Sequence, residues 1–198
     1  MLLIEIDGVN MRCFIAIDIT EDIRAELAEL QKDLAGRVDI RKGDVKWVKP
    51  EGVHLTLKFL GEVPDSQIAE LCNVVKEVTG RHKAFDFAVK EVGSFGGRSA
   101  RVLWVGAGLD CPELLELQKD LEERLDAAGW PREGRKFSGH LTLCRIRNAR
   151  AGEKLGEAAR QYGHCDLGTI RAAAICVYES QLKPEGPIYT RLGNYTLR

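Results

Sequence analysis

Two identical four-residue segments contain the residues best suited to chemistry. They read His-Leu-Thr-Leu, from His54 to Leu57 and from His140 to Leu143. Side chains two positions apart on a β-strand share a face, so each histidine would point the same way as its threonine, with the leucines facing the core. Histidine exchanges a proton near neutral pH because its ordinary pKa is about 6.5, and a threonine hydroxyl can donate a hydrogen bond.

Two such units on opposite sides of one space fit in-line displacement at phosphorus. One histidine would deprotonate the incoming oxygen while the other protonates the leaving oxygen. Thr56 and Thr142 would hold the non-bridging oxygens. The alternatives are two polar residues on exposed strand faces, or a metal site, although the repeated unit offers no third histidine or carboxylate as a ligand. We therefore expect His54 and His140 to be catalytic, with no metal and no cofactor.

A second repeated word indicates that the chain is an internal duplication. Glu29 to Leu34 and Glu116 to Leu121 both read ELQKDL, 87 residues apart, and the two HLTL segments are 86 residues apart. Hydrophobic periodicity predicts the same order of elements in both halves. The first half has expected strands at 13–18, 45–48, 53–60 and 85–92 and helices at 20–34 and 65–78. The second half has expected strands at 102–105, 139–146 and within 170–182 and helices at 112–127 and 153–162.

This pattern predicts an α+β fold with two lobes related by a pseudo-twofold axis. Each lobe would be a mainly antiparallel sheet with helices on its outer face, and the active-site cleft would lie between the sheets. We expect residues 1–198 to form a single bilobal domain, because no Pro/Gly/Ser-rich linker separates the halves. Residues 1–10 would be an N-terminal extension, either an added edge strand or an artefact of an upstream start, without an assigned function.

The composition limits the classes of partner. The 198 residues include 29 basic and 30 acidic side chains, for a formal net charge of -1, so no global positive field exists to hold long nucleic acid. Apolar runs are too short to cross a membrane, and no basic leader with a cleavage site begins the chain. We expect a cytoplasmic monomer without a membrane partner, and six scattered cysteines that are buried thiols.

Four stretches carry a resemblance to a known superfamily. They are MRCFIAIDI from Met11, WVKPEGVHLTLKFLG from Trp47 to Gly61, RVLWVG from Arg101 to Gly106 and HLTLCRIR from His140 to Arg147. Together they resemble the two-histidine (2H) phosphoesterases, and most of all the RNA 2′,3′-cyclic phosphodiesterase branch, formerly called 2′-5′ RNA ligases. The resemblance covers nearly the whole chain from Met11 onward.

The resemblance implies a reaction and a polarity. The reaction is hydrolysis of an RNA terminal 2′,3′-cyclic phosphate to a 2′-phosphomonoester, so the expected partners are RNA 3′ ends or oligonucleotides with that terminus. His54 matches the proton donor and His140 the proton acceptor, by family order alone. Alternative functions are an esterase for a small cyclic nucleotide or ADP-ribose cyclic phosphate, a non-catalytic RNA-end-binding module, and a ligase that runs the reverse reaction.

Three further side chains are candidates for the site. Phe14 shares a strand face with Ala16, so we expect it to contact a base or ribose, with ordinary packing as the alternative. Arg145 stands where the family carries a basic residue that would bind phosphate. Strict alternation puts Arg145 on the leucine face, so it reaches the cleft only if the strand twists or bulges. Lys58 has the parity of the cleft face but is equally suited to a solvated surface.

Overall fold

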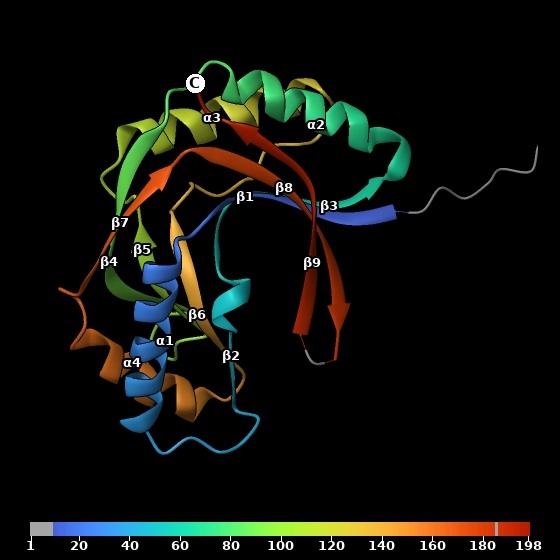
Figure 1. The fold of residues 1–198 in the computed structure, drawn as a ribbon. Helices are drawn as coiled ribbons and strands as arrows, with labels where there is room; N and C mark the ends of the chain where they lie inside the picture. Colours follow the sequence, from blue (N-terminus) through green and yellow to red (C-terminus); the bar gives the residue numbers. More distant parts are fainter. Residues whose placement is uncertain (1–9, 185) are drawn as a thin grey trace, which may run out of the picture.

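The computed structural model describes residues 10–184 and 186–198 as two antiparallel sheets with helices packed on their outer faces (Figure 1). The first sheet has the order β3-β1-β8-β9, with β3 His54–Pro64, β1 Asn10–Asp18, β8 Ala174–Lys183 and β9 Gly186–Thr196. The second sheet has the order β2-β6-β5-β4-β7, with β2 Val45–Trp47, β6 His140–Ile146, β5 Val102–Ala107, β4 Phe85–Phe95 and β7 Asp166–Ala172. The predicted α+β class is therefore confirmed.

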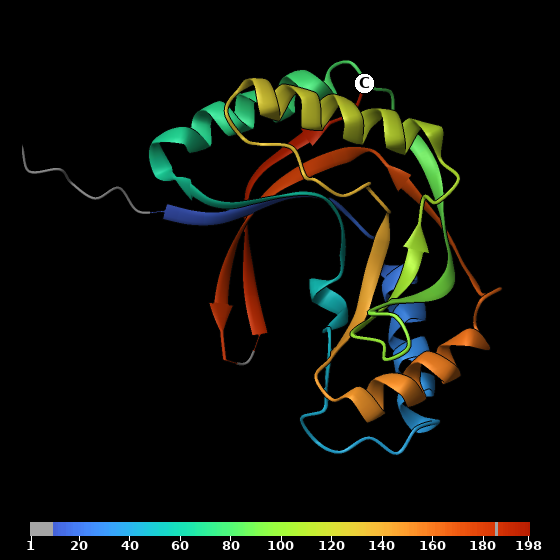
Figure 2. The same cartoon turned by 180° about the vertical axis from the view of Figure 1, so that it is seen from behind.

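Four helices cover the two sheets. They are α1 Glu21–Gly36, α2 Asp65–Thr79, α3 Pro112–Ala127 and α4 Ala149–Arg160, and a short 3-10 turn, η1, spans Pro50–Gly52. Helices α2 and α3 pack together over the first sheet, whereas α1 and α4 pack against the second (Figures 1 and 2). Helix α1 has an N-cap residue, because the Thr20 hydroxyl accepts a hydrogen bond from the Ile23 N–H at 3.4 Å.

The two halves of the sequence exchange elements instead of forming one lobe each. Strand β4, expected to close the first half, lies in the second sheet, and β8 and β9 from the end of the chain complete the first sheet. Helix α1 likewise packs against the sheet that contains the second HLTL segment, and α3 against the sheet that contains the first. The lobes are thus interlocked by chain crossings.

The ELQKDL repeat supplies equivalent core residues to both sheets. Three leucines of α1 and three of α3 are buried at matching positions of the repeat: Leu27, Leu30 and Leu34, and Leu114, Leu117 and Leu121. Their i, i+3, i+7 spacing gives each helix one apolar face.

Each HLTL strand carries one extra residue directly after its threonine. In β3, Ala16 of β1 pairs with Thr56 but Ile15 pairs with Lys58, which leaves Leu57 as the additional residue. In β6, the pairs Trp104–Thr142 and Leu103–Cys144 leave Leu143 additional in the same way. A β-bulge of this kind turns two consecutive side chains toward one face. After each motif, the side chains that would face one side of the sheet in a regular strand therefore face the other.

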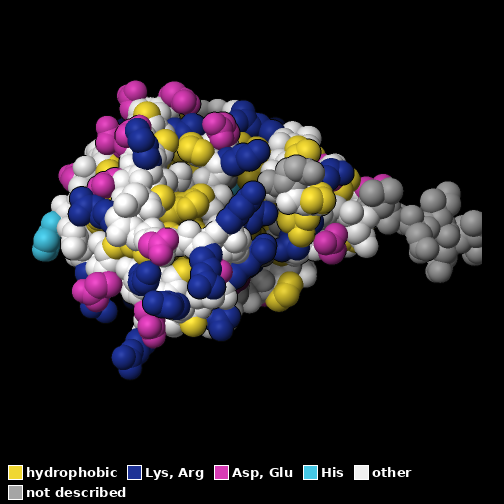
Figure 3. All heavy atoms as spheres, turned by 90° about the horizontal axis from the view of Figure 1, so that it is seen from below, with side chains coloured by type: hydrophobic (Ala, Val, Ile, Leu, Met, Phe, Trp, Pro, Cys, Tyr) yellow, Lys and Arg dark blue, Asp and Glu magenta, His cyan; other side chains and the backbone are white. Residues whose placement is uncertain are grey.

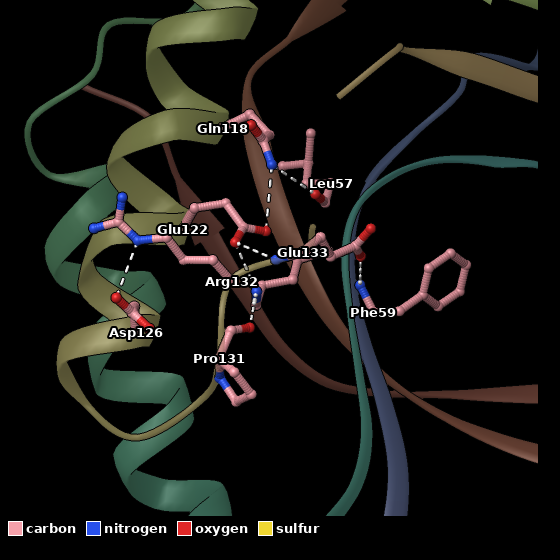
Figure 4. Close-up of polar contacts among 9 residues, drawn as sticks. Leu57, Phe59, Gln118, Glu122, Asp126, Pro131, Arg132 and Glu133 are labelled. Atoms are coloured by element: carbon pink, nitrogen blue, oxygen red, sulfur yellow. Dashed lines mark hydrogen bonds and ion pairs between the residues drawn. The ribbon is translucent and has the colours of Figure 1, made fainter. Parts of the chain in front are cut away.

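Lys58 is consequently a core residue, and neither expectation for its side chain was right. It is 1% exposed, and its ammonium donates to Glu122 Oε2 and to the Pro131 carbonyl, both at 2.8 Å. Glu122 also accepts the Glu133 N–H at 3.2 Å, and the Glu133 carboxylate accepts the Phe59 N–H at 3.3 Å (Figure 4). This network fastens the segment that leads to His140 onto the edge of β3.

We expect Lys58→Met to lower the free energy of unfolding by about 3–5 kcal/mol, because it leaves the Glu122 carboxylate buried without its partner. Lys32→Met is the matched control: Lys32 makes an exposed ion pair with Glu29 at 3.5 Å, and its loss should cost less than about 1 kcal/mol. Urea unfolding measures both. Equal stabilities for the two variants would contradict the structural role of the Lys58–Glu122 pair.

Candidate active site

His54 lies in a shell of aromatic rings. Its ring stacks on Phe14 with centroids 4.5 Å apart and an interplanar angle of 22°, and Tyr189 meets it edge-on at 5.2 Å. Tyr178 also stacks on Phe14, with centroids 5.3 Å apart, and its centroid lies 6.4 Å from that of His54. Burial lowers the pKa of His54 to about 4, although a hydrogen bond to the Gly52 carbonyl and the negative charge of Asp18 oppose that shift. In the unliganded protein, His54 is therefore neutral at pH 7.

His140 lies beside a different set of aromatic rings. Its Nδ1 lies 2.8 Å from the Ser138 carbonyl, Phe95 meets the ring edge-on at 5.1 Å, and Trp104 lies 6.3 Å away. A carbonyl can only accept, so Nδ1 carries the proton and the Nε2 lone pair of neutral His140 is free. Both histidines thus bond to the backbone carbonyl two residues earlier, Gly52 for the first and Ser138 for the second.

The bulges decide which residues accompany the histidines. Thr56 and Thr142 lie before the bulges, so their side chains share a strand face with His54 and His140. Both threonines are half-buried. Beyond the bulges, Arg145 and Phe59 regain that face; Arg145 is exposed, and Phe59 is 57% exposed. The condition for Arg145 to reach the site, a bulge in its strand, is therefore met.

Arg145 lies near the aromatic shell of His54. Burial raises the pKa of Tyr189, whereas the positive charges of Arg145 and Arg12 lower it. Tyr189 belongs to the first sheet and Arg145 to the second, and strands β3 and β6 are also in contact. The two HLTL strands thus lie near each other in different sheets, and we call the region where they meet the inter-sheet site.

Phe14 is buried, which matches the alternative of ordinary packing and not the expected contact with a base or ribose. It is 3% exposed, between His54, Tyr178 and Tyr189. Its ring supports His54 and is not presented for stacking. Phe59, whose ring centroid is 6.2 Å from that of Phe14, is the aromatic ring open to solvent there.

A polar cluster that the sequence did not predict lies next to the aromatic rings around His54. Asp18 accepts hydrogen bonds from the Tyr178 hydroxyl at 2.7 Å and from Arg191 at 2.6 Å, and Arg191 Nε donates to the Tyr178 hydroxyl at 3.2 Å. Tyr189 and Arg191 come from β9, which was not predicted. The turn-forming residues at 184–187 and the β-branched and aromatic residues that follow were the available signal.

The surface at this side of the molecule carries basic and hydrophobic side chains. Figure 3 shows Lys and Arg side chains gathered across the middle of the face below the sheets of Figure 1, interspersed with hydrophobic side chains. In residues 10–184 and 186–198, no three His, Cys, Asp or Glu side chains are grouped to hold a metal ion. None of the helices in the described part of the chain is both long and apolar enough to cross a membrane. All six cysteines are free thiols, four of them buried.

We expect His54 to make the protein less stable as the pH falls. The unfolded chain binds a proton at this histidine below pH 6.5, whereas the folded protein does so only near pH 4. Stability attributable to His54 is therefore complete above about pH 6.5 and falls by up to about 3 kcal/mol toward pH 4.

Urea unfolding of the wild type and of His54→Gln from pH 4 to 7.5 measures this contribution. All other titratable groups are shared, so the difference between the two curves reports on His54. A difference that does not change with pH would contradict the burial of a neutral ring.

Comparisons with known proteins identify the family of this chain. The family model described as "LigT like Phosphoesterase" matches residues 17–104 and 110–189. A Methanocaldococcus jannaschii protein named RNA 2′,3′-cyclic phosphodiesterase is 34% identical over 180 residues, covering 90% of this chain and 96% of the relative. A Thermotoga maritima protein of the same name is 35% identical over 185 residues, covering 90% and 91%.

Solved structures share the fold. A Thermus thermophilus protein superimposes with a TM-score of 0.77 at 26% identity, covering 95% of this chain and 98% of its own. Escherichia coli LigT, crystallised with 3′-AMP, gives a TM-score of 0.71 at 24% identity, covering 96% and 99%. The residues matched by the family model include both HLTL strands and most of the elements that pack against them. The chain therefore belongs to the LigT-like family of two-histidine phosphoesterases.

Proposed function

We propose that this protein hydrolyses the terminal 2′,3′-cyclic phosphate of RNA to a 2′-phosphomonoester, using His54 and His140 as acid and base. The proposal is supported by the pair of His-x-Thr units, which lie on equivalent bulged strands of two sheets, and by the contact between these two strands. The substrate class comes from the relatives, which are named RNA 2′,3′-cyclic phosphodiesterases and cover at least 90% of this chain.

In the proposed reaction, neutral His140 accepts a proton from water at Nε2 as the water oxygen bonds to phosphorus. The bond from phosphorus to the ribose 3′-oxygen breaks, and His54 donates a proton to that oxygen. The products are a free 3′-hydroxyl and a 2′-phosphate. Thr56 and Thr142 donate hydrogen bonds to the non-bridging oxygens, and Arg145 adds positive charge to stabilise the transition state.

The low pKa of His54 adds a requirement to this assignment. A neutral ring cannot act as an acid, so His54 must take up a proton when substrate arrives. A phosphate anion beside the imidazole favours the charged form and raises its pKa. The resemblance assigns the donor role to His54 because its motif is the first of the two. That role is compatible with the burial of His54 only if substrate and proton bind together.

The face around the site suits single-stranded RNA more than a long duplex. Basic side chains gather on this face, while the net charge of the chain is -1, so the attraction is local. Exposed Phe59 offers a π-face next to the shell of His54, which suits base stacking. A small cyclic nucleotide is the rival substrate, because it too needs only local charge.

The test is turnover of a short oligonucleotide and of a mononucleotide, both ending in a 2′,3′-cyclic phosphate, with ³¹P NMR to identify the product. We expect a 2′-phosphate, faster turnover of the oligonucleotide, and no effect of EDTA. His54→Ala and His140→Ala should each lower kcat by at least about 10²-fold, because each removes one proton transfer.

His82→Ala and His164→Ala are the matched controls, since neither side chain belongs to the inter-sheet site, and both should retain activity. A 3′-phosphate product would contradict the proposed leaving group. Full activity in both His54→Ala and His140→Ala would refute the acid–base role, and inhibition by EDTA would indicate a metal.

A further inference from the structure

The glutamines of the two ELQKDL segments reach across to the HLTL strand of the opposite half. Gln31 in α1 donates from Nε2 to the Leu143 and Val48 carbonyls, both at 2.8 Å. Gln118 in α3 donates from Nε2 to the Leu57 carbonyl and to Glu122 Oε1, both at 3.4 Å. Equivalent side chains of the duplication thus bind equivalent backbone carbonyls.

Leu57 and Leu143 are the extra residues of the two bulges. A bulge leaves its extra residue outside the regular ladder, so its backbone groups need other partners. Gln31 is 8% exposed, and a buried amide of this kind is costly unless it is hydrogen-bonded. The Leu143 carbonyl also accepts the Val48 N–H at 2.9 Å, so two donors hold this bulge from one side.

We infer that Gln31 is a positioning residue for Arg145, and Gln118 for Phe59. Each glutamine favours the bulged form of the strand that it contacts. That form turns the residue two places beyond the extra leucine toward the inter-sheet site, while Lys58 and Cys144 turn inward and are buried. In a regular strand, Arg145 would face the core. Helix α1 of the first half thereby positions the phosphate contact of the second half, and helix α3 of the second half positions the base contact of the first.

The inference rests on the proposed function for its kinetic test, which uses kcat/KM for the cyclic-phosphate oligonucleotide. Gln31→Met keeps the length of the side chain and removes its donor. Gln118→Met makes the same change at the equivalent position, where the bulge directs Phe59 instead of Arg145. The two variants are therefore controls for each other.

We expect Gln31→Met and Arg145→Ala each to lower kcat/KM about tenfold or more, and the double variant to be no worse than Arg145→Ala alone. Gln31→Met combined with Phe59→Ala should instead show multiplied effects. Gln118→Met should behave the opposite way: no further loss in the Phe59→Ala background, and multiplied effects with Arg145→Ala. This crossed pattern is not expected of a loss of core stability, which would lower activity in every background.

Multiplied effects in all four combinations would overturn the inference. If Gln31→Met does not fold, the Gln118→Met and Phe59→Ala combinations still decide it at the other strand. Amide hydrogen exchange provides a readout without turnover: Gln31→Met should speed exchange at residues 143–145, and Gln118→Met at residues 57–59. Slow exchange at both places would refute the inference, whereas a wild type without turnover would refute only the proposed function.

Discussion

Each histidine-bearing strand carries an extra residue directly after its threonine, relative to the neighbouring strand, and that residue decides which side chains share a face with the histidine. Side chains alternate strictly along a regular strand, so His-x-Thr alone would be followed by Lys58 or Cys144 on the same face. Because Leu57 and Leu143 are extra, Phe59 and Arg145 take that face. Without the bulge, a guanidinium would point into a leucine core, which is strongly unfavourable.

The duplication supplies two similar histidines, and later differences give them unlike surroundings. His54 lies against Phe14 and two tyrosines and has a pKa of about 4, whereas His140 lies beside Phe95 and Trp104. Acid–base pairs depend on environments that distinguish chemically equal groups. At the residues just beyond the bulges the copies also differ: an aromatic ring follows the first motif and a guanidinium the second. A symmetric frame thus gives its two histidines unlike surroundings.

Much of this structure could be predicted from periodicity and repetition. The helices and most of the strands follow from apolar spacing, and the repeated HLTL segments identify the face that carries His54 and His140. Interactions between distant segments could not be foreseen. Lys58 has the spacing of a site residue, but its bulge and its partner Glu122, 64 positions away, make it a core residue.

The exchange of strands between halves was also beyond the sequence patterns. Strand β9 was not predicted, and with it Tyr189 and Arg191 were missed, because hydrophobic alternation in 186–196 is weak. Arg145 was predicted conditionally, since alternation alone excluded it and only a bulge could restore it. The bulge in β6 depends on a contact from α1, and the local sequence of β6 does not reveal that contact.

We propose that the two histidines face a single phosphate from opposite sides, and a crystal structure with a bound nucleoside 2′-monophosphate would show whether they do. We expect the Nε2 atoms of His54 and His140 within about 3 Å of different phosphate oxygens, with Thr56 and Thr142 donating to the others. A phosphate in contact with only one of the two histidines, or bound outside the inter-sheet site, would contradict it.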